Sequence, residues 1–232
     1  MSIHPDSPAS RLARILPVDG TQGAGLGDVI FSALRQALRD GTFQPGDRLR
    51  EEEIAEHFSV SRTPVRDALR RMSERRLLEI SGGRGMMIRR LTRAEVFELY
   101  EMREIMEGTA ARFAAKNASS TEITLLTDLQ AAFETADTPQ EWARINKQFH
   151  GTIAGAVRNR FFHSPLEELQ DFLALLGSTT FSVAGRAEPA ADEHRRILEA
   201  IAARDPDAAE AAARDHIRSA LVSRLKMLND AG

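Results

Sequence analysis

The sequence predicts a mainly α-helical protein, in which a small N-terminal domain that ends in a two-stranded ribbon precedes a larger antiparallel bundle of helices. Three observations predict this class. Apolar residues recur at helical spacing in three short segments of the first third of the chain. Two short apolar runs around a Gly-rich turn follow them. Beyond Leu91, six segments open with helix-start signals, which favours an all-α bundle.

These observations divide the 232 residues into three parts. Residues 1–25 are rich in Pro, Ser and Gly and are expected to form a flexible arm. Residues 26–91 form the first domain and residues 92–232 the second. The chain has no run of about 18 apolar residues, which argues against a membrane span. It has no cysteine, which excludes disulfides and cysteine-ligated metals and favours a cytoplasmic protein.

The first domain begins with three helices. A stripe of apolar residues from Leu26 to Leu38 ends before Gly41, a residue suited to a helix C-terminus. Residues 50–58 form a short helix with an acidic first turn. A third helix begins after Ser61 and has a proline in its first turn.

The third helix has two chemically different sides. Its inward side is apolar and consists of Val65, Ala68, Leu69 and Met72. Arg62, Arg66 and Arg70 follow one another at four-residue spacing on the outer side. A ribbon follows, with strands near 77–80 and 86–88. Helix, helix, turn, helix and ribbon is the order of a winged helix-turn-helix, whose third helix enters the major groove of DNA.

The charge distribution supports a polyanionic partner for the first domain. Residues 1–91 hold 15 Arg and no Lys against 12 acidic residues, a net charge of +3. Residues 92–232 hold 16 basic and 22 acidic residues, a net charge of −6. Each arginine alone is more often part of a solvated surface. Together with the order of the elements, the arginines indicate DNA binding.

The segments "SRTPVRDALRRM" and "LLEISGGRG" resemble the DNA-binding domain of GntR-type bacterial transcription regulators over about residues 26–90. The resemblance implies contacts to a double-stranded DNA operator from the third helix and from the turn of the ribbon. The implied residues are Arg62, Thr63, Arg66, Arg70, Gly83, Arg84 and Gly85. Some members have an arginine at the position of Glu52, so that contact is not carried over.

The second domain contains six predicted helix starts. Thr92, Ser119 and Thr138 are each followed three residues later by a Glu, the pattern of a capping box. Another helix is expected to open at Ser164-Pro165. Two more are expected near Pro189 and at Asp205-Pro206.

Polar residues on the inward stripes of these helices are the candidate site residues. His150, His194 and His216 lie on core-facing stripes of three helices, and Asn146 precedes His150 by one turn. One such histidine alone is more often a satisfied core residue. Three histidines on facing helices indicate a metal site. Two ligands four residues apart on one helix, such as Asn146 and His150, can bind one ion, and the facing helices can supply the other ligands. Arg103 also lies on an inward stripe.

The segments "EMREIMEGTAARFAA", "NKQFHGTIAGAVRN" and "DEHRRILEAIAARD" resemble the FCD effector-binding domain of the fatty-acid-regulator (FadR-type) branch of the GntR family. The resemblance implies a divalent metal, Zn or Ni, bound by Asn146, His150, His194 and His216. An aspartate is common where Asn146 stands, and an amide oxygen is a weaker ligand. It further implies that Arg103 faces a small carboxylate effector, and that the protein is a homodimer.

The leading hypothesis is therefore a ligand-responsive DNA-binding transcription regulator, by default a repressor released by a small carboxylate or sugar acid. One alternative is a constitutive DNA-binding protein whose bundle only dimerises. A metalloenzyme is disfavoured, because no general base stands out: Glu104 and Glu107 lie near Arg103 in sequence, but nothing fixes their orientation. The effector, the operator and the sign of regulation are open at this level.

Overall fold

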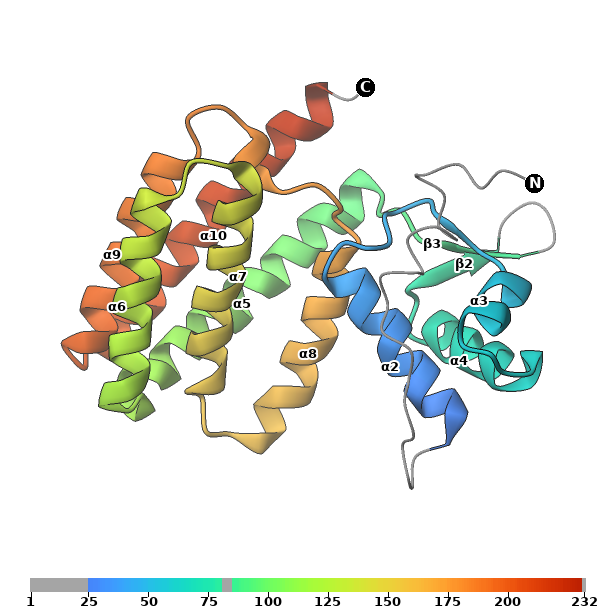
Figure 1. Ribbon diagram of the computed structural model, residues 1–232. Coiled ribbons are helices and arrows are strands. Elements are labelled where there is room, and N and C mark those ends of the chain that lie inside the picture. The colour runs from blue at the N-terminus through green and yellow to red at the C-terminus, as the bar shows by residue number, and fades with distance from the viewer. Residues whose placement is uncertain (1–24, 81–84, 231–232) are drawn as a thin grey trace. The chain divides into compact units, whose positions relative to one another are not determined.

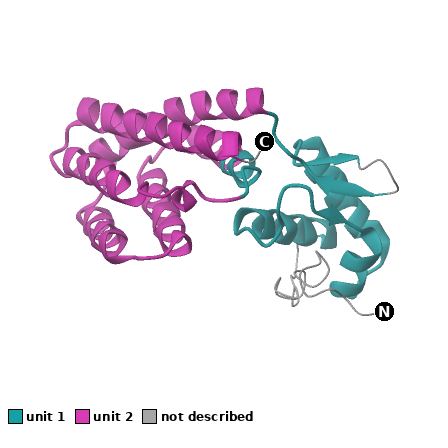
Figure 2. Ribbon diagram, turned by 90° about the horizontal axis from the view of Figure 1, so that it is seen from above, with its two compact units in different colours: residues 1–92, 170–177 teal, residues 93–169, 178–232 magenta. Residues whose placement is uncertain are grey.

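The computed structural model describes residues 25–80 and 85–230. The chain forms two compact units, coloured separately in Figure 2. Unit 1 comprises the chain up to residue 92 together with residues 170–177, and unit 2 comprises residues 93–169 and 178–232. The predicted flexible arm lies outside the described residues, apart from Gly25. Among the helices of the described ranges, none has both the length and the apolar character that a membrane crossing requires.

Unit 1 has the predicted order of helices and ribbon (Figure 1). Its elements up to residue 92 are α2 (Leu26–Arg39), β1 (Arg48–Leu49), α3 (Glu51–His57), α4 (Arg62–Glu74), β2 (Leu78–Ile80) and β3 (Met86–Ile88). The strands form one antiparallel sheet in the order β1-β3-β2. The third strand, β1, was not predicted, because two residues are too short to show an alternating pattern.

The helix ends and the core of unit 1 follow from its sequence. Helix α2 stops at the predicted point, where Gly41 adopts a φ of +80°, a left-handed conformation that glycine takes without strain. Leu34, Ile54 and Leu69 contribute to one apolar core, so each of the three helices buries its apolar stripe. Burial of these stripes holds α4 with its opposite side toward solvent.

Unit 2 is helical, as predicted. Its helices are α5 (Arg93–Asn117), α6 (Ser120–Thr135), α7 (Pro139–Gly155), α8 (Arg160–Ala174), α9 (Ala187–Ala202) and α10 (Pro206–Asp230), with a short 3-10 turn η1 (Thr180–Ser182). The last five residues of α8 belong to unit 1. Helices α5 and α10 have 25 residues each and pack along one another. The bundle core is rich in alanine, which lets the helix backbones approach closely.

Two of the predicted helix starts are confirmed in atomic detail. At α6, the backbone N–H of Glu122 donates to Ser119 Oγ (3.2 Å) while Ser119 N donates to Glu122 Oε2 (2.7 Å). At α7, Thr138 accepts from the N–H of Glu141, and Pro139 occupies the first helical position. Both caps satisfy backbone donors that a helix start otherwise leaves unpaired.

The predicted start at Ser164 is wrong. Helix α8 begins at Arg160, where Asn159 Oδ1 accepts a hydrogen bond from Phe161 N (3.0 Å), and Pro165 lies inside the helix. A proline so near the start removes one hydrogen bond, the one that would reach back to Phe161. The Asn cap and the apolar stripe of α8 outweigh that loss.

Candidate nucleic-acid interface and metal centre

Helix α4 presents an arginine face to solvent. Val65, Ala68 and Met72 are fully buried against the rest of unit 1. The side chains of Arg62, Arg66 and Arg70 are each more than half exposed, and Thr63 is exposed as well. The division into an inward apolar side and an outward basic side is therefore the one predicted from the sequence.

Each of the three arginines has a carboxylate partner within unit 1. Arg62 Nη1 lies 2.9 Å from Glu52 Oε1, and Arg66 donates three hydrogen bonds to Glu51, the shortest at 2.9 Å. Arg70 pairs with Asp67 (2.6 Å) and with Glu74. The hydrogen bond to Glu51 raises the pKa of Arg66 above its usual value.

These exposed pairs are exchangeable. An ion pair in full contact with water contributes little to stability, because solvent screens it. A phosphate group or a guanine edge can therefore replace the carboxylate with little loss to the fold. The second predicted group of contacts belongs to the turn of the ribbon: Gly83 and Arg84 lie outside the described residues, and Gly85 directly precedes β3.

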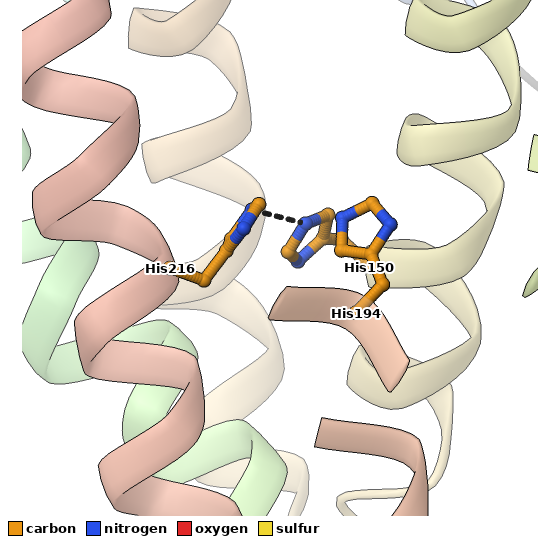
Figure 3. Close-up of side chains that lie close together, drawn as sticks. All are labelled: His150, His194 and His216. Carbon is orange, nitrogen blue, oxygen red and sulfur yellow. Dashed lines mark hydrogen bonds between the residues drawn. The ribbon is translucent and has the colours of Figure 1, made fainter. Parts of the chain in front are cut away.

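Unit 2 brings the three predicted histidines together. Candidate ligand nitrogens of His150 on α7, His194 on α9 and His216 on α10 all lie within 4.8 Å of one another. Figure 3 shows the three rings converging from their helices. His150 Nε2 lies 3.2 Å from His216 Nε2. Residues 44 and 22 positions apart along the chain thus meet at one point of the bundle.

A carboxylate contacts the Nδ1 side of the His150 ring, and an arginine binds that carboxylate. Its Nδ1 lies 2.7 Å from Glu107 Oε2, although the two groups are not well aligned for a hydrogen bond. Arg103 Nε donates to Glu107 Oε1 at 2.5 Å. Burial alone would raise the pKa of Glu107, but the charges of Arg103 and His150 outweigh it and hold that pKa well below its usual value.

The same arrangement stands behind His216. Its Nδ1 lies 2.7 Å from Glu193 Oε2, and Arg186 forms a two-pronged pair with Glu193 at 2.6 and 3.1 Å. All three side chains are almost fully buried. We call the two arrangements, Arg103–Glu107–His150 and Arg186–Glu193–His216, the two relays. Each ends on an Nε2 atom that faces the other.

His194 is the third member of the centre and has no polar partner. Its ring stacks on Phe149, with 4.6 Å between centroids, and neither ring nitrogen has a hydrogen-bond partner among the described residues. Burial, followed by the nearby His216 and His150, lowers the pKa of His194 well below its usual value. Burial likewise lowers the pKa of His216. Both imidazoles are therefore neutral near pH 7, the form in which histidine binds a metal.

The histidines fit a divalent ion by two further criteria. A carboxylate can only accept, so the Nδ1 that faces it carries the proton and leaves a lone pair on Nε2. With both protons on Nδ1, the Nε2 lone pairs of His150 and His216 face each other, an arrangement that a cation between them would stabilise. Two histidine ligands of a tetrahedral zinc ion stand about 3.3 Å apart, from metal–nitrogen bonds of about 2.0–2.1 Å. The observed 3.2 Å agrees with that spacing.

The sequence did not assign three residues to the centre, namely Glu107, Glu193 and Arg186. Glu107 was noted but without an orientation, although it lies one turn after Arg103 and shares its inward stripe. Glu193 directly precedes His194, and adjacent helix positions do not normally share a target. Arg186 precedes α9 and had no signal. The predicted fourth ligand, Asn146, is half-buried one turn before His150, and its role stays a prediction.

Comparison with protein families assigns both parts of the chain. The FCD domain model matches residues 98–219, and the model of bacterial regulatory proteins of the gntR family matches residues 26–88. The chain belongs to the gntR family and carries an FCD domain. This gntR-family protein is thus a DNA-binding transcriptional regulator with a helical C-terminal domain, as the fatty-acid-regulator resemblance implied.

Individual relatives agree with this assignment. The chain is 30% identical over 184 residues to the uncharacterized HTH-type transcriptional regulator YdhC of Bacillus subtilis, covering 78% of this chain and 82% of the relative. It is also 30% identical to a probable D-xylose utilization operon transcriptional repressor of Paenarthrobacter nicotinovorans, covering 79% and 82%. The solved structure of E. coli McbR/YncC has the same fold, with a TM-score of 0.75 at 19% identity over 88% of this chain and 99% of that one. The Bacillus and Paenarthrobacter relatives are both named as transcriptional regulators.

Proposed function

We propose that this regulator is a homodimeric repressor whose DNA affinity changes when a small carboxylate binds at a metal ion held by the three histidines. The convergence of nitrogen atoms from three histidines within 4.8 Å is the observation that carries the proposal. His150, His194 and His216 would hold the ion, and Zn²⁺ or Ni²⁺ suits nitrogen ligands. When bound, the ion supplies a positive charge that attracts a ligand oxygen.

The charges around the centre favour an anionic effector. Arg103 and Arg186 are balanced by Glu107 and Glu193, and the histidines are expected to be neutral in the metal-bound state. Within the two relays, no negative charge is left to balance the two positive charges of a divalent ion. A carboxylate would neutralise part of that charge, and the planar guanidinium of Arg103 suits a carboxylate geometrically.

A ligand changes DNA binding only when it binds two conformations of the protein differently. A dimer offers such conformations, because the spacing of two recognition helices must match two half-sites of the operator. Repression relieved by the ligand is the sign that we propose. The name of the Paenarthrobacter relative, a probable repressor of a sugar-utilisation operon, agrees with it.

The metal part of the proposal is tested by metal content and thermal shift. We expect Zn²⁺ or Ni²⁺ to bind at about one ion per chain and to raise the melting temperature, because a ligand that binds the native state stabilises it. His194→Ala removes one ligand and is expected to abolish the shift. His163→Ala, at an exposed position of α8, is the matched control and should retain it. Equal shifts in both variants would refute the histidine centre.

The effector part is tested by DNA binding. A DNA duplex selected by the protein from a random library serves as the operator probe. Its affinity is measured with a panel of small carboxylic and sugar acids and with neutral sugars. We expect at least one acid to lower the affinity in the wild type and to lose its effect in Arg103→Ala. If no acid changes the affinity, the bundle is a structural dimerisation domain and the sensor proposal is wrong.

A further inference from the structure

The DNA-binding unit contains residues from far along the chain. Residues 170–177, from the end of α8 onward, belong to unit 1 (Figure 2). Leu175 is 2% exposed and lies in the same apolar core as Leu34, Leu69 and Met72 of α2 and α4. Phe172 and Ala174 pack against that core as well. A connecting segment would normally be polar and solvated, so this burial calls for a structural explanation.

Asp171 makes the polar contacts of this segment. Its side chain is 3% exposed, and its two carboxylate oxygens accept hydrogen bonds from Arg35 Nε at 2.8 and 2.7 Å. Arg39 Nε donates to the same carboxylate at 2.5 Å. Arg35 and Arg39 stand one turn apart on α2, so one carboxylate binds one face of that helix. Arg75, just after α4, lies 4.0 Å away.

Helix α2 in turn packs against the recognition helix α4. Arg71 of α4 donates to Asp28 of α2 at 2.6 Å, and its guanidinium lies 4.4 Å from the centre of the Phe31 ring. A displacement of α2 would therefore carry α4 with it. A hydrogen bond to a base edge depends on the position of the arginine that makes it, so the position of α2 bears on how α4 meets DNA.

We propose that Asp171 is a positioning residue for DNA recognition, and that the last turn of α8 completes the DNA-binding unit by locking α2 in place. The carboxylate is buried and paired, so its removal takes a negatively charged partner away from two guanidinium groups. Helix α8 is continuous from Arg160, and its earlier part belongs to unit 2, where Leu166 and Leu169 are buried. The same helix thus takes part in both units. This inference requires DNA binding by unit 1 but neither the metal nor the effector.

Affinity measurements with Asp171 variants test the positioning role. Asp171→Asn keeps the size of the side chain but removes its charge. Measured at a temperature at which the variant is folded by circular dichroism, we expect its affinity for the selected operator duplex to fall tenfold or more. Its affinity for random duplex should change less than twofold, because the exposed arginines of α4 are untouched. Asp171→Glu retains the charge and is expected to restore most of the operator affinity.

The matched control is Asp128→Asn, at an exposed position of α6, which should leave both affinities unchanged. A folded Asp171→Asn protein that binds the operator as tightly as the wild type would overturn the proposal. Equal loss on operator and random duplexes would also overturn it, because the residue would then act on stability or charge alone.

Thiol labelling tests the docking of the segment independently of DNA. The chain has no cysteine, so Leu175→Cys introduces a single reactive thiol. We expect that thiol in the full-length protein to react at least 100-fold more slowly than the thiol of Phe161→Cys, at an exposed position at the other end of α8. Adding Asp171→Asn should accelerate the reaction of Leu175→Cys at least tenfold. Similar rates for the two single variants would show that the segment is not docked and would overturn the proposal even if Asp171→Asn failed to fold.

Discussion

The arginines on the outer side of α4 and the two arginines of the relays in unit 2 make the same contacts in opposite surroundings. On α4, Arg62 and Arg66 pair with carboxylates at the surface, where more than half of each arginine side chain meets water. In unit 2, Arg103 and Arg186 pair with carboxylates in the interior. Both sets use a guanidinium opposite a carboxylate at hydrogen-bond distance.

The difference shows how burial decides what an ion pair does. A surface pair can exchange its carboxylate for another anion, so it can serve a reader of DNA. A buried pair cannot be broken without leaving a charge in a poorly solvated place, so it serves as a rigid support. Glu193 accordingly holds His216 in a fixed orientation through a hydrogen bond, and Glu107 lies equally close to His150.

The largest expected effect is the removal of a buried partner. Glu193→Ala removes the carboxylate that binds both Arg186 and the Nδ1 of His216 in the interior, and we expect it to lower the free energy of unfolding by about 3–5 kcal/mol. Urea denaturation of the metal-free protein measures this change. Glu199→Ala, at an exposed position of the same helix, is the control and should have almost no effect.

The surface half of the comparison is tested by Glu51→Ala, which removes the partner of Arg66. We expect the midpoint of urea denaturation to be unchanged. If Glu51→Ala and Glu193→Ala destabilise the protein equally, the contrast between exchangeable and supporting pairs is wrong.

A second effect concerns pH. The pKa values of His194 and His216 are lowered in the folded state. Below pH 6.5 these two histidines therefore bind protons in the unfolded chain but remain neutral in the folded protein. Stability is therefore fully present above pH 6.5 and is lost as the pH falls toward the folded pKa values. For the metal-free protein we expect a loss on the order of 2 kcal/mol or more between pH 7 and pH 5.

Urea denaturation across this pH range, with a chelator present, measures the loss. His194→Phe keeps an aromatic ring against Phe149 but removes one titrating group, and we expect it to reduce the pH dependence. An unchanged dependence would mean that His194 accepts a proton as readily in the folded protein as in the unfolded chain.

A third prediction concerns DNA binding by the arginines of the exchangeable surface pairs on α4. Affinity for DNA should fall as salt increases, and Arg66→Ala should reduce the slope of log affinity against log salt by about one per chain if Arg66 binds a phosphate. If Arg66 instead binds a base, the variant should lose about tenfold or more on the selected duplex and little on random DNA. Arg144→Ala, at an exposed position of unit 2, serves as the control. No change in either measurement would remove Arg66 from the interface.

A smaller loss of stability is expected from the removal of a surface hydrogen bond of unit 2. Ser119→Ala removes the side-chain acceptor of the α6 cap, and we expect a loss of about 1 kcal/mol in the free energy of unfolding. Ser120→Ala, at the next position, makes no change to the cap and is the control. A loss as large as that of Glu193→Ala would mean that exposure does not separate weak from strong polar contacts in this unit.

Much of the fold could be predicted because its signals are local. Helices α6 and α7 begin where Ser119 and Thr138 predicted, since a cap depends on residues only three positions apart. The basic side of α4 followed from the helical period alone. The start of α8 was misjudged because Ser164-Pro165 matches a helix start locally, whereas the cap that the chain uses is Asn159.

By itself, the sequence determined the helices, the arginine face of α4 and the three histidines on inward stripes, because each depends on periodicity within one helix. The tertiary structure alone decided which groups stand behind those histidines. It also decided that Asp171 meets Arg35, 136 residues earlier in the chain. Such meetings depend on how helices pack, and a helical stripe specifies that a side chain points inward but not what it meets there. The roles of the carboxylates of both relays, and the packing of the last turn of α8 in unit 1, could therefore be identified only from the tertiary structure.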